Sequence, residues 1–360
     1  MKKFTSFLSI LFVGLFTTSA IAADNNNLTK APERKITNPD DASQFNHQFA
    51  QINGIKMHYV DEGEGPAIVL LHGFPLTWYS WRNQIPALVE AGYRVIVPTQ
   101  RGYGQTEAPE NIEDYTLTTL AGDVVGLLNH LKVDDAVIAG WDWGSPVAYT
   151  AALVRPDLFS GLVMISSPYA PRSDQLPSEL WKTRFRDNGM VFYQDYFQTP
   201  GVEDTDYKDS AYSMRFILNS LSATAGPDER GGFIMKPGQA VSEIMVEPKK
   251  LPEWLTPQVL EYYVSEFESF TGALNWYRAV DLGWKNTSFL AGAKVQQPAL
   301  FIAGDQDPGI IYGKAVYDKL EENVPNLYKN VLIPDASHLT PEETPEAVNE
   351  LLIDFMKHVK

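Results

Sequence analysis

The chain has 360 residues, no Cys, and a formal net charge of −16 from 29 Lys and Arg against 45 Asp and Glu. Its 44% hydrophobic content is enough for one large domain or two smaller ones, which excludes disorder as a global description. The absence of Cys excludes disulfides, thiolate metal sites and a Cys nucleophile, and the 6 His argue against a His-rich metal cluster. An acidic surface repels phosphates, so nucleic acid and anionic membranes are not expected partners.

The first 22 residues have the pattern of a secretory signal. A basic start precedes an apolar run over residues 7–16, and small residues at 20–22 form a cleavage site of the A-x-A type. The apolar run is too short to span a bilayer. We therefore expect export to a bacterial periplasm or secretion, a flexible polar leader over residues 23–44, and no membrane span after the signal is removed.

Strand and helix patterns alternate over the next part of the chain. An alternating segment at 51–60 contains the turn Asn53-Gly54, which is a hairpin signal. Short apolar runs, typical of strands buried on both faces, occur at 67–71, 93–98, 135–139 and 162–165. Helical patterns occur at 117–131 and 146–154. This alternation predicts an α/β fold with a mostly parallel sheet and helices on both faces.

A long helical insertion, rich in aromatic residues, interrupts this alternation. Strand patterns return only at 299–303 and 330–333, and an amphipathic helix over 346–359 closes the chain. The sequence therefore predicts a core of residues 45–170 and 285–360 with a helical cap of residues 171–284. An insertion between late strands lies over their carboxyl ends, where α/β sheets bind ligands.

The segment Gly140-Trp141-Asp142-Trp143-Gly144 joins a predicted strand to a predicted helix. Its two glycines permit a sharp turn that raises the central side chain above the sheet, where esterases have Ser. Asp142 is therefore the candidate nucleophile, although an Asp that caps a helix would give the same pattern. Ser145 lies outside the glycine pair and is the weaker candidate.

A second turn follows the predicted strand at 67–71. Gly73, in the segment H-G-F-P at 72–75, lets the next backbone amide point inward. The N–H groups of Phe74 and Trp143 are then predicted to form a two-donor oxyanion hole. A plain tight turn is the alternative interpretation.

The candidate acid and base lie just past the last two predicted strands. Asp307 follows the strand at 299–303, with Asp305 as the competing acid, and His338 follows the strand at 330–333. The chain order Asp142, Asp307, His338 is that of nucleophile, acid and base in this type of fold. All three side chains can converge because each follows the end of a strand.

A carboxylate nucleophile displaces well at saturated carbon and forms an alkyl ester. His338, oriented by Asp307, then activates a water that attacks the Asp142 carbonyl. A halide leaving group needs only N–H donors, whereas an epoxide oxygen needs a proton donor such as Tyr. The insertion offers tyrosines at 193–201 and 275–278, but these aromatics also suit a core, and their periodicity does not select two donors.

Six segments together resemble the α/β-hydrolase-fold epoxide hydrolases over about residues 48–358: H-G-F-P at 72–75, W-R at 81–82, R-G-Y-G at 101–104, G-W-D-W-G at 140–144, Y-Q-D-Y-F-Q-T-P-G at 193–201 and N-W-Y-R at 275–278. The resemblance implies that Tyr193 and Tyr277 are the ring-opening acids and that the insertion is the family's cap. The chain departs from the family pattern at Trp141, where His is frequent, and at Thr99, where P-D-x-R-G has Asp.

The resemblance predicts that the chain converts a small hydrophobic epoxide and water to a vicinal diol. It places His72 and Trp143 in the substrate pocket and calls for no metal or other cofactor. The oligomeric state and the natural epoxide stay open. The alternative is a haloalkane dehalogenase, which shares the fold and the Asp142-Trp143 pair but usually has Asn where Phe74 stands. A fluoroacetate-type dehalogenase would need Arg at position 143, and a catalytically dead binding module would lack a triad residue.

Overall fold

The structure, a computed structural model, describes residues 35–231 and 233–359. The predicted signal at 1–22 lies outside the described residues. Within the predicted leader, residues 36–44 pack against the core: the Asp40 carboxylate pairs with the buried Arg82 at 2.9 Å, and the Asp40 carbonyl accepts the Tyr79 hydroxyl at 2.7 Å. The part of the predicted leader over residues 36–44 is thus in contact with the core, where Asp40 partners the buried cation of Arg82.

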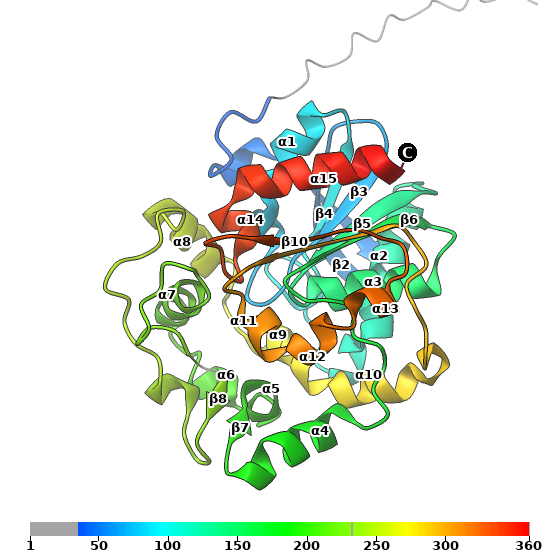
Figure 1. The fold of residues 1–360 in the computed structure, drawn as a ribbon. Coiled ribbons are helices and arrows are strands. Elements are labelled where there is room, and N and C mark those ends of the chain that lie inside the picture. The colour runs from blue at the N-terminus through cyan, green and yellow to red at the C-terminus, as the bar shows by residue number, and fades with distance from the viewer. Residues whose placement is uncertain (1–34, 232, 360) are drawn as a thin grey trace, which may run out of the picture. The chain divides into compact units, whose positions relative to one another are not determined.

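An eight-stranded sheet lies at the centre of the fold, in the order β1-β2-β4-β3-β5-β6-β9-β10 (Figure 1). The strands are β1 (His47–Ile52), β2 (Ile55–Glu62), β3 (Ala67–Leu71), β4 (Arg94–Pro98), β5 (Ala136–Trp141), β6 (Phe159–Ile165), β9 (Ala299–Gly304) and β10 (Leu327–Ile333). β2 is antiparallel to both of its neighbours, and the other pairs are parallel. The mostly parallel α/β sheet is confirmed.

The strands follow the sequence pattern that predicted them. β3, β5 and β9 are buried along their whole length, which explains their unbroken apolar runs. The β1–β2 hairpin turns at Asn53 and Gly54, whose φ angles of 46° and 85° are both positive. Asn-Gly is favoured in such two-residue turns because both positions need left-handed backbone.

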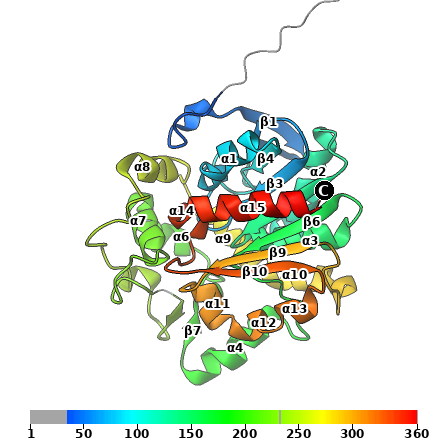
Figure 2. The same cartoon turned by 45° about the horizontal axis from the view of Figure 1, so that its top comes forward.

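Helices cover both faces of the sheet. α1 (Gln84–Glu90) and α15 (Pro345–Val359) pack together on one face, and α2 (Leu117–His130) and α3 (Gly144–Val154) pack together on the other (Figure 2). Shorter helices lie near the last strands: α11 (Pro308–Tyr312), α12 (Lys314–Tyr317), α13 (Leu320–Asn323) and α14 (Thr340–Glu343). Single 3₁₀ turns are η1 (Ala42–Gln44), η2 (Trp78–Trp81), η3 (Ile112–Tyr115), η4 (Arg186–Asn188), η5 (Val241–Glu243) and η6 (Ser288–Leu290).

The insertion between β6 and β9 is mainly helical. Its helices are α4 (Pro177–Arg184), α5 (Tyr193–Tyr196), α6 (Val202–Thr205), α7 (Ser210–Ser220), α8 (Pro257–Ser265), α9 (Thr271–Arg278) and α10 (Val280–Asn286). It also contains an antiparallel pair that was not predicted, β7 (Val191–Phe192) with β8 (Ile234–Met235), because two-residue strands carry no readable alternation. Of the helices in the described part of the chain, none has the length and apolar character needed to cross a membrane.

Candidate active site

Asp142 lies in a tight turn between β5 and α3, with a positive φ of 54°. Gly140 and Gly144 have to be glycines, because a Cβ at either position would overlap backbone atoms. A Cβ at Gly140 would overlap the Gly144 carbonyl, and a Cβ at Gly144 would overlap the Leu71 carbonyl at the end of β3. The turn therefore stores backbone strain in order to present one carboxylate above the carboxyl ends of the strands.

Asp142, His338 and Asp307 form a continuous hydrogen-bonded chain. His338 Nε2 lies 3.2 Å from Oδ2 of Asp142, and His338 Nδ1 lies 3.0 Å from Oδ1 of Asp307. Asp307 is fully buried, and its Oδ1 also accepts the Gly309 N–H at 2.7 Å. The structure thus brings together the three residues that were predicted to form the triad.

The protonation of His338 depends on its two carboxylate neighbours. Burial disfavours the charged imidazole, but the charge of Asp307 and hydrogen bonds to Asp142 and Asp307 outweigh it and raise the pKa of His338 to about 10. While both carboxylates are ionised, the ring therefore carries a proton at neutral pH and donates to both of them.

One of the two expected oxyanion donors is already in use. The Phe74 N–H donates to Oδ1 of Asp142 at 2.8 Å. Gly73 makes this approach feasible, since a Cβ there would overlap the Asp142 carboxylate. Trp143, the other expected donor, is the N-cap residue of α3, directly after the nucleophile. The Phe74 amide is therefore placed to bind negative charge on a carboxyl oxygen of Asp142.

Tyr193 and Tyr277 reach the site from different helices of the insertion. Tyr193 begins α5 and Tyr277 lies in α9, and their ring centroids are 5.9 Å apart. Burial, followed by the charge of Asp142, raises the pKa of the Tyr193 hydroxyl well above its usual range. Burial, followed by the neighbouring Tyr193 and Asp142, does the same to Tyr277. Both hydroxyls are therefore protonated and available as donors at neutral pH.

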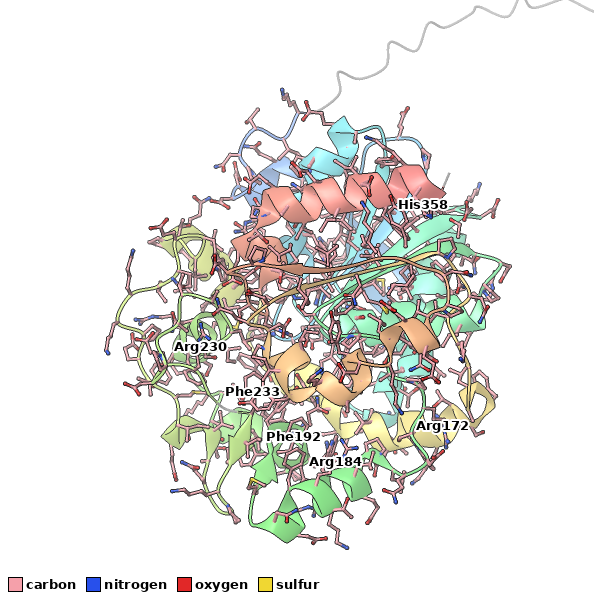
Figure 3. The ribbon with its side chains drawn as sticks, viewed as in Figure 1. Arg172, Arg184, Phe192, Arg230, Phe233 and His358 are labelled. Carbon is pink, nitrogen blue, oxygen red and sulfur yellow. The ribbon has the colours of Figure 1, made fainter. Side chains whose placement is uncertain are left out.

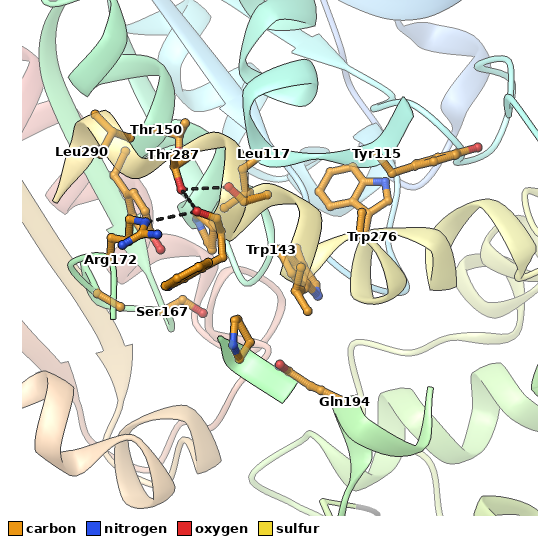
Figure 4. Close-up of a pocket in the computed structure, with 18 of the residues that line it drawn as sticks. Tyr115, Leu117, Trp143, Thr150, Ser167, Arg172, Gln194, Trp276, Thr287 and Leu290 are labelled. Carbon is orange, nitrogen blue, oxygen red and sulfur yellow. Dashed lines mark hydrogen bonds between the residues drawn. The ribbon is translucent and has the colours of Figure 1, made fainter. Parts of the chain in front are cut away.

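Two cavities of about 430 and 510 Å³ meet at the nucleophile. Both are lined by Asp142, Ser167, Leu180, Trp181, Tyr193 and Gln194. The first continues along Trp143 and α10 towards Leu290 and Arg172 (Figure 4). The second is lined by Tyr277 and His338 and by cap residues that include Arg184, Phe192 and Phe233 (Figure 3). The volumes and mainly apolar walls suit a small organic substrate.

His72 does not line either cavity, which corrects the prediction that it belongs to the substrate pocket. The side chain is fully buried, its Nε2 accepts the Gln100 N–H at 2.9 Å, and its ring packs edge-on against Tyr103. Burial lowers the pKa of His72 to about 4, so the ring is neutral. The His72 ring links the end of β3 to the end of β4 through Gln100. The sequence shows that His72 follows a strand, but it does not show in which direction the side chain points.

The structure also shows where the competing acid, Asp305, and the competing nucleophile, Ser145, lie. Asp305 is exposed and its side chain does not reach His338 in the described structure, whereas Asp307 does. The Ser145 hydroxyl is buried and donates to the Ser167 carbonyl at 2.6 Å, so it is committed elsewhere. Among the described residues, no group of three or more His, Cys, Asp or Glu side chains could bind a metal ion.

Two polar residues near the site were not predicted. Gln194 Nε2 donates to the Tyr193 hydroxyl at 2.8 Å, and Glu343 accepts the backbone N–H groups of Ser337 at 2.7 Å and Ala223 at 2.5 Å. The position of Gln194 directly after the candidate acid Tyr193 could have indicated a role near the site. No sequence pattern indicates the role of Glu343, because its partners are backbone groups distant in sequence.

Comparison with known proteins places this site in a family. The alpha/beta hydrolase fold family matches residues 66–345. Epoxide hydrolase A of Mycobacterium tuberculosis is 38% identical over 315 residues, which cover 86% of this chain and 96% of that protein. The solved structure of an epoxide hydrolase from an endophytic Streptomyces has a TM-score of 0.84 at 34% identity and covers 88% of this chain and 96% of its own. Epoxide Hydrolase A from Mycobacterium thermoresistibile has a TM-score of 0.81 at 40% identity, with 87% and 98% covered.

Proposed function

This chain belongs to the α/β-hydrolase-fold family and is an epoxide hydrolase, and from this premise we propose that Asp142 is its nucleophile. Oδ1 of Asp142 is held by the Phe74 N–H, so Oδ2 attacks one carbon of the epoxide. A C–O bond of the ring breaks as the ester bond forms. The departing oxygen takes a proton from Tyr193 or Tyr277, whose hydroxyls are protonated at neutral pH.

The second step hydrolyses the ester. Once Asp142 is esterified it carries no charge, so His338 loses one of the two carboxylates that hold its proton. That proton passes to the tyrosinate left by ring opening, which restores the tyrosine and leaves the imidazole neutral. The neutral ring, oriented by Asp307 through Nδ1, takes a proton from water as the water attacks the Asp142 carbonyl carbon. The Phe74 N–H, together with that of Trp143, binds the oxyanion that forms on Oδ1. When the tetrahedral intermediate collapses, the bond between the carboxyl carbon and the diol oxygen breaks, and that oxygen takes the proton of the newly added hydroxyl. The diol leaves, and Asp142 is again a carboxylate beside a protonated His338.

The presence of Tyr193 and Tyr277 beside the nucleophile favours an epoxide as the substrate over a halogenated alkane. Tyr193 lines both cavities beside Asp142, and Tyr277 lines the second. An alkoxide leaving group needs such an acid, whereas a halide needs only N–H donors. The Phe74 side chain, at the position where dehalogenases usually have a halide donor, can donate nothing. The pocket walls favour a small hydrophobic epoxide as the substrate, with water as the second reactant.

Isotopic labelling tests the ester intermediate. In a single turnover in H₂¹⁸O, we expect unlabelled diol, because its new oxygen comes from Asp142, and label in the Asp142 carboxyl group. Over many turnovers the diol also becomes labelled. Label in the diol at the first turnover would show direct attack of water and would reject Asp142 as the nucleophile.

His338→Gln offers an independent test of the second step. The variant keeps a polar side chain but cannot take a proton, so the alkyl ester should accumulate. Intact-protein mass spectrometry would then show an increase equal to the mass of the substrate, and Asp142→Asn is the matched control that forms no adduct. The absence of an adduct in His338→Gln argues against the two-step scheme.

We also propose that the protein is exported, on the pattern of residues 1–22. The export system would cleave after Ala22. Mass spectrometry of the protein recovered from the periplasm or medium of an expressing bacterium should give a mature chain that begins at Ala23. A chain that keeps Met1 and stays in the cytoplasm would contradict export without affecting the proposed chemistry.

A further inference from the structure

Arg172 is the positive charge of the first cavity. Of the residues that line this 430 Å³ cavity, only Asp142 has an acidic side chain and only Arg172 a basic one, and the other walls are largely apolar or aromatic. Among the described residues, no carboxylate lies within ion-pair distance of the Arg172 guanidinium. The Arg172 side chain is half-buried, so part of its charge is shielded from water and no anion offsets it.

The guanidinium is held in a fixed orientation. Its Nε donates to the Trp284 carbonyl at 3.1 Å, and its central carbon lies 3.7 Å from the centroid of the Trp284 ring. The Trp284 indole in turn donates to the Ser173 carbonyl at 2.8 Å. Figure 4 shows Arg172 beside Leu290 and Thr287, on the opposite side of the cavity from Gln194. Within the described structure the two terminal nitrogens of Arg172 make no hydrogen bond, so both are left for a ligand.

The position of Arg172 makes this charge relevant to substrate choice. Arg172 lies on the segment that leaves β6 for the cap, and Trp284 lies on α10 where the cap returns. Figure 3 shows Arg172 well apart from Arg184 and the phenylalanines of the second cavity. The Asp142 carboxylate and the Arg172 guanidinium therefore line the same cavity. The other residues that line it are mainly apolar.

Resting on the proposed function, we propose that Arg172 binds the carboxylate of an epoxide that carries one at the end of an apolar arm. The arm lies in the first cavity, the epoxide lies at Asp142, and the carboxylate takes the two terminal N–H groups of Arg172 in the side-by-side geometry that guanidinium favours. The overall charge of −16 opposes such a substrate at long range. That repulsion is screened within about 10 Å by salt, whereas the contact inside the cavity is not.

The test compares epoxides that differ only in charge. A series of terminal-epoxide carboxylic acids of increasing chain length is assayed beside the matching primary amides, and kcat/KM for diol formation is measured for each. We expect an acid-to-amide ratio of about ten or more at the chain length that spans the cavity, and a smaller ratio at shorter lengths. In Arg172→Gln this ratio should fall to about one, and Arg172→Lys should keep part of it.

Lys285→Gln is the matched control. Lys285 is exposed on the same helix as Trp284 and lies outside the lining, so the variant removes the same charge without touching the cavity. Its ratio should equal that of the unaltered protein. The ratio is insensitive to a general loss of folded enzyme, because both substrates are affected alike.

Three results would overturn the proposal: a ratio of one or less in the unaltered protein, a ratio that survives in Arg172→Gln, or an equal loss in Lys285→Gln. Turnover of the amides tests the proposed function separately. If the amides react and the acids gain nothing, only the role of Arg172 is lost. If neither class gives diol, the proposed function is lost and this inference falls with it.

Discussion

Nε2 of His338 lies 3.2 Å from Oδ2 of Asp142, so the proton affinity of the base depends on the charge of the nucleophile. In the free enzyme the two groups form an ion pair, and the pKa of His338 is about 10. Esterification of Asp142 removes that charge while the burial that disfavours imidazolium stays. The proton is then released at the point in the cycle where a base is needed.

Replacing Asp142 with Asn imitates the neutral ester. We expect the pKa of His338 in Asp142→Asn to lie below the value of about 10 in the unaltered protein, and diol formation to stop because the amide is a poor nucleophile. NMR titration of the His338 ring measures the shift. A pKa that is the same in both proteins would show that Asp142 does not control the base.

The stability of the fold should depend on pH through the same residue. The folded-state pKa of His338 is raised above its unfolded value of about 6.5. Its contribution to the free energy of unfolding is therefore full below pH 6.5 and is lost as the pH rises towards 10. Urea unfolding should show the advantage of the unaltered protein over His338→Gln shrinking across this range. An advantage that grows with pH would contradict the raised pKa.

Removing both tyrosine hydroxyls should stop epoxide opening. A positioned general acid contributes about 10²–10⁴-fold, so Tyr193→Phe combined with Tyr277→Phe is expected to lower kcat at least about 10²-fold. Tyr196→Phe is the control, because Tyr196 lies on the same short helix but donates to Asp206 and lines neither cavity. A double variant with the original rate would refute the acid assignment.

Gly73→Ala tests the approach of the Phe74 amide to the nucleophile. The added methyl would overlap the Asp142 carboxylate, and a displacement near 1 Å costs about 10²-fold in rate. We therefore expect kcat to fall by that factor or more. The control is Gly122→Ala, inside α2, where the nearest atom to the new Cβ is 3.9 Å away. Because Ala favours the helix interior over Gly, the free energy of unfolding of this control should rise by about 0.5–1 kcal/mol. Normal turnover in Gly73→Ala would contradict this packing.

Glu343 should act as a positioning residue for the base. Its carboxylate joins the Ser337 N–H, next to His338, to the Ala223 N–H in the cap, and the His338 N–H itself donates to the Leu221 carbonyl. Glu343→Gln leaves one of these N–H groups facing an amide NH₂, which should lower the free energy of unfolding by about 1–3 kcal/mol.

The kinetic signature of Glu343→Gln separates positioning from general stability. We expect kcat to fall about tenfold, with ester hydrolysis slowed and ester formation little changed, because the base acts only in the second step. The exposed Glu346→Gln, three residues later, should match the unaltered protein. Equal slowing of both steps would mean that Glu343 supports the fold and not the base.

The sequence predicted those parts of the fold whose residues repeat a local rule. The buried strands β3, β5 and β9 showed unbroken apolar runs, and the glycines around Asp142 marked a turn that only small residues permit. The triad followed from chain order, since each member lies just after a strand. The family resemblance selected Tyr193 and Tyr277, which periodicity could not.

Contacts between distant segments could not be predicted in this way. The packing of residues 36–44 depends on Asp40 meeting Arg82, and the burial of His72 depends on Gln100, which comes from a different strand end. Glu343 likewise binds backbone groups of two other segments. Such partners are set by tertiary structure, so a single sequence without the fold gives no indication of them.

The junction of two cavities at Asp142 sets separate steric limits on the two substituents of an epoxide. Leu153 and Leu290 border one side only, and Phe216 and Ile217 border the other only. Enlarging one side therefore leaves the opposite side with its original dimensions. The preference for one mirror-image form, and for attack at one ring carbon over the other, can be redesigned from either side without altering the reacting groups.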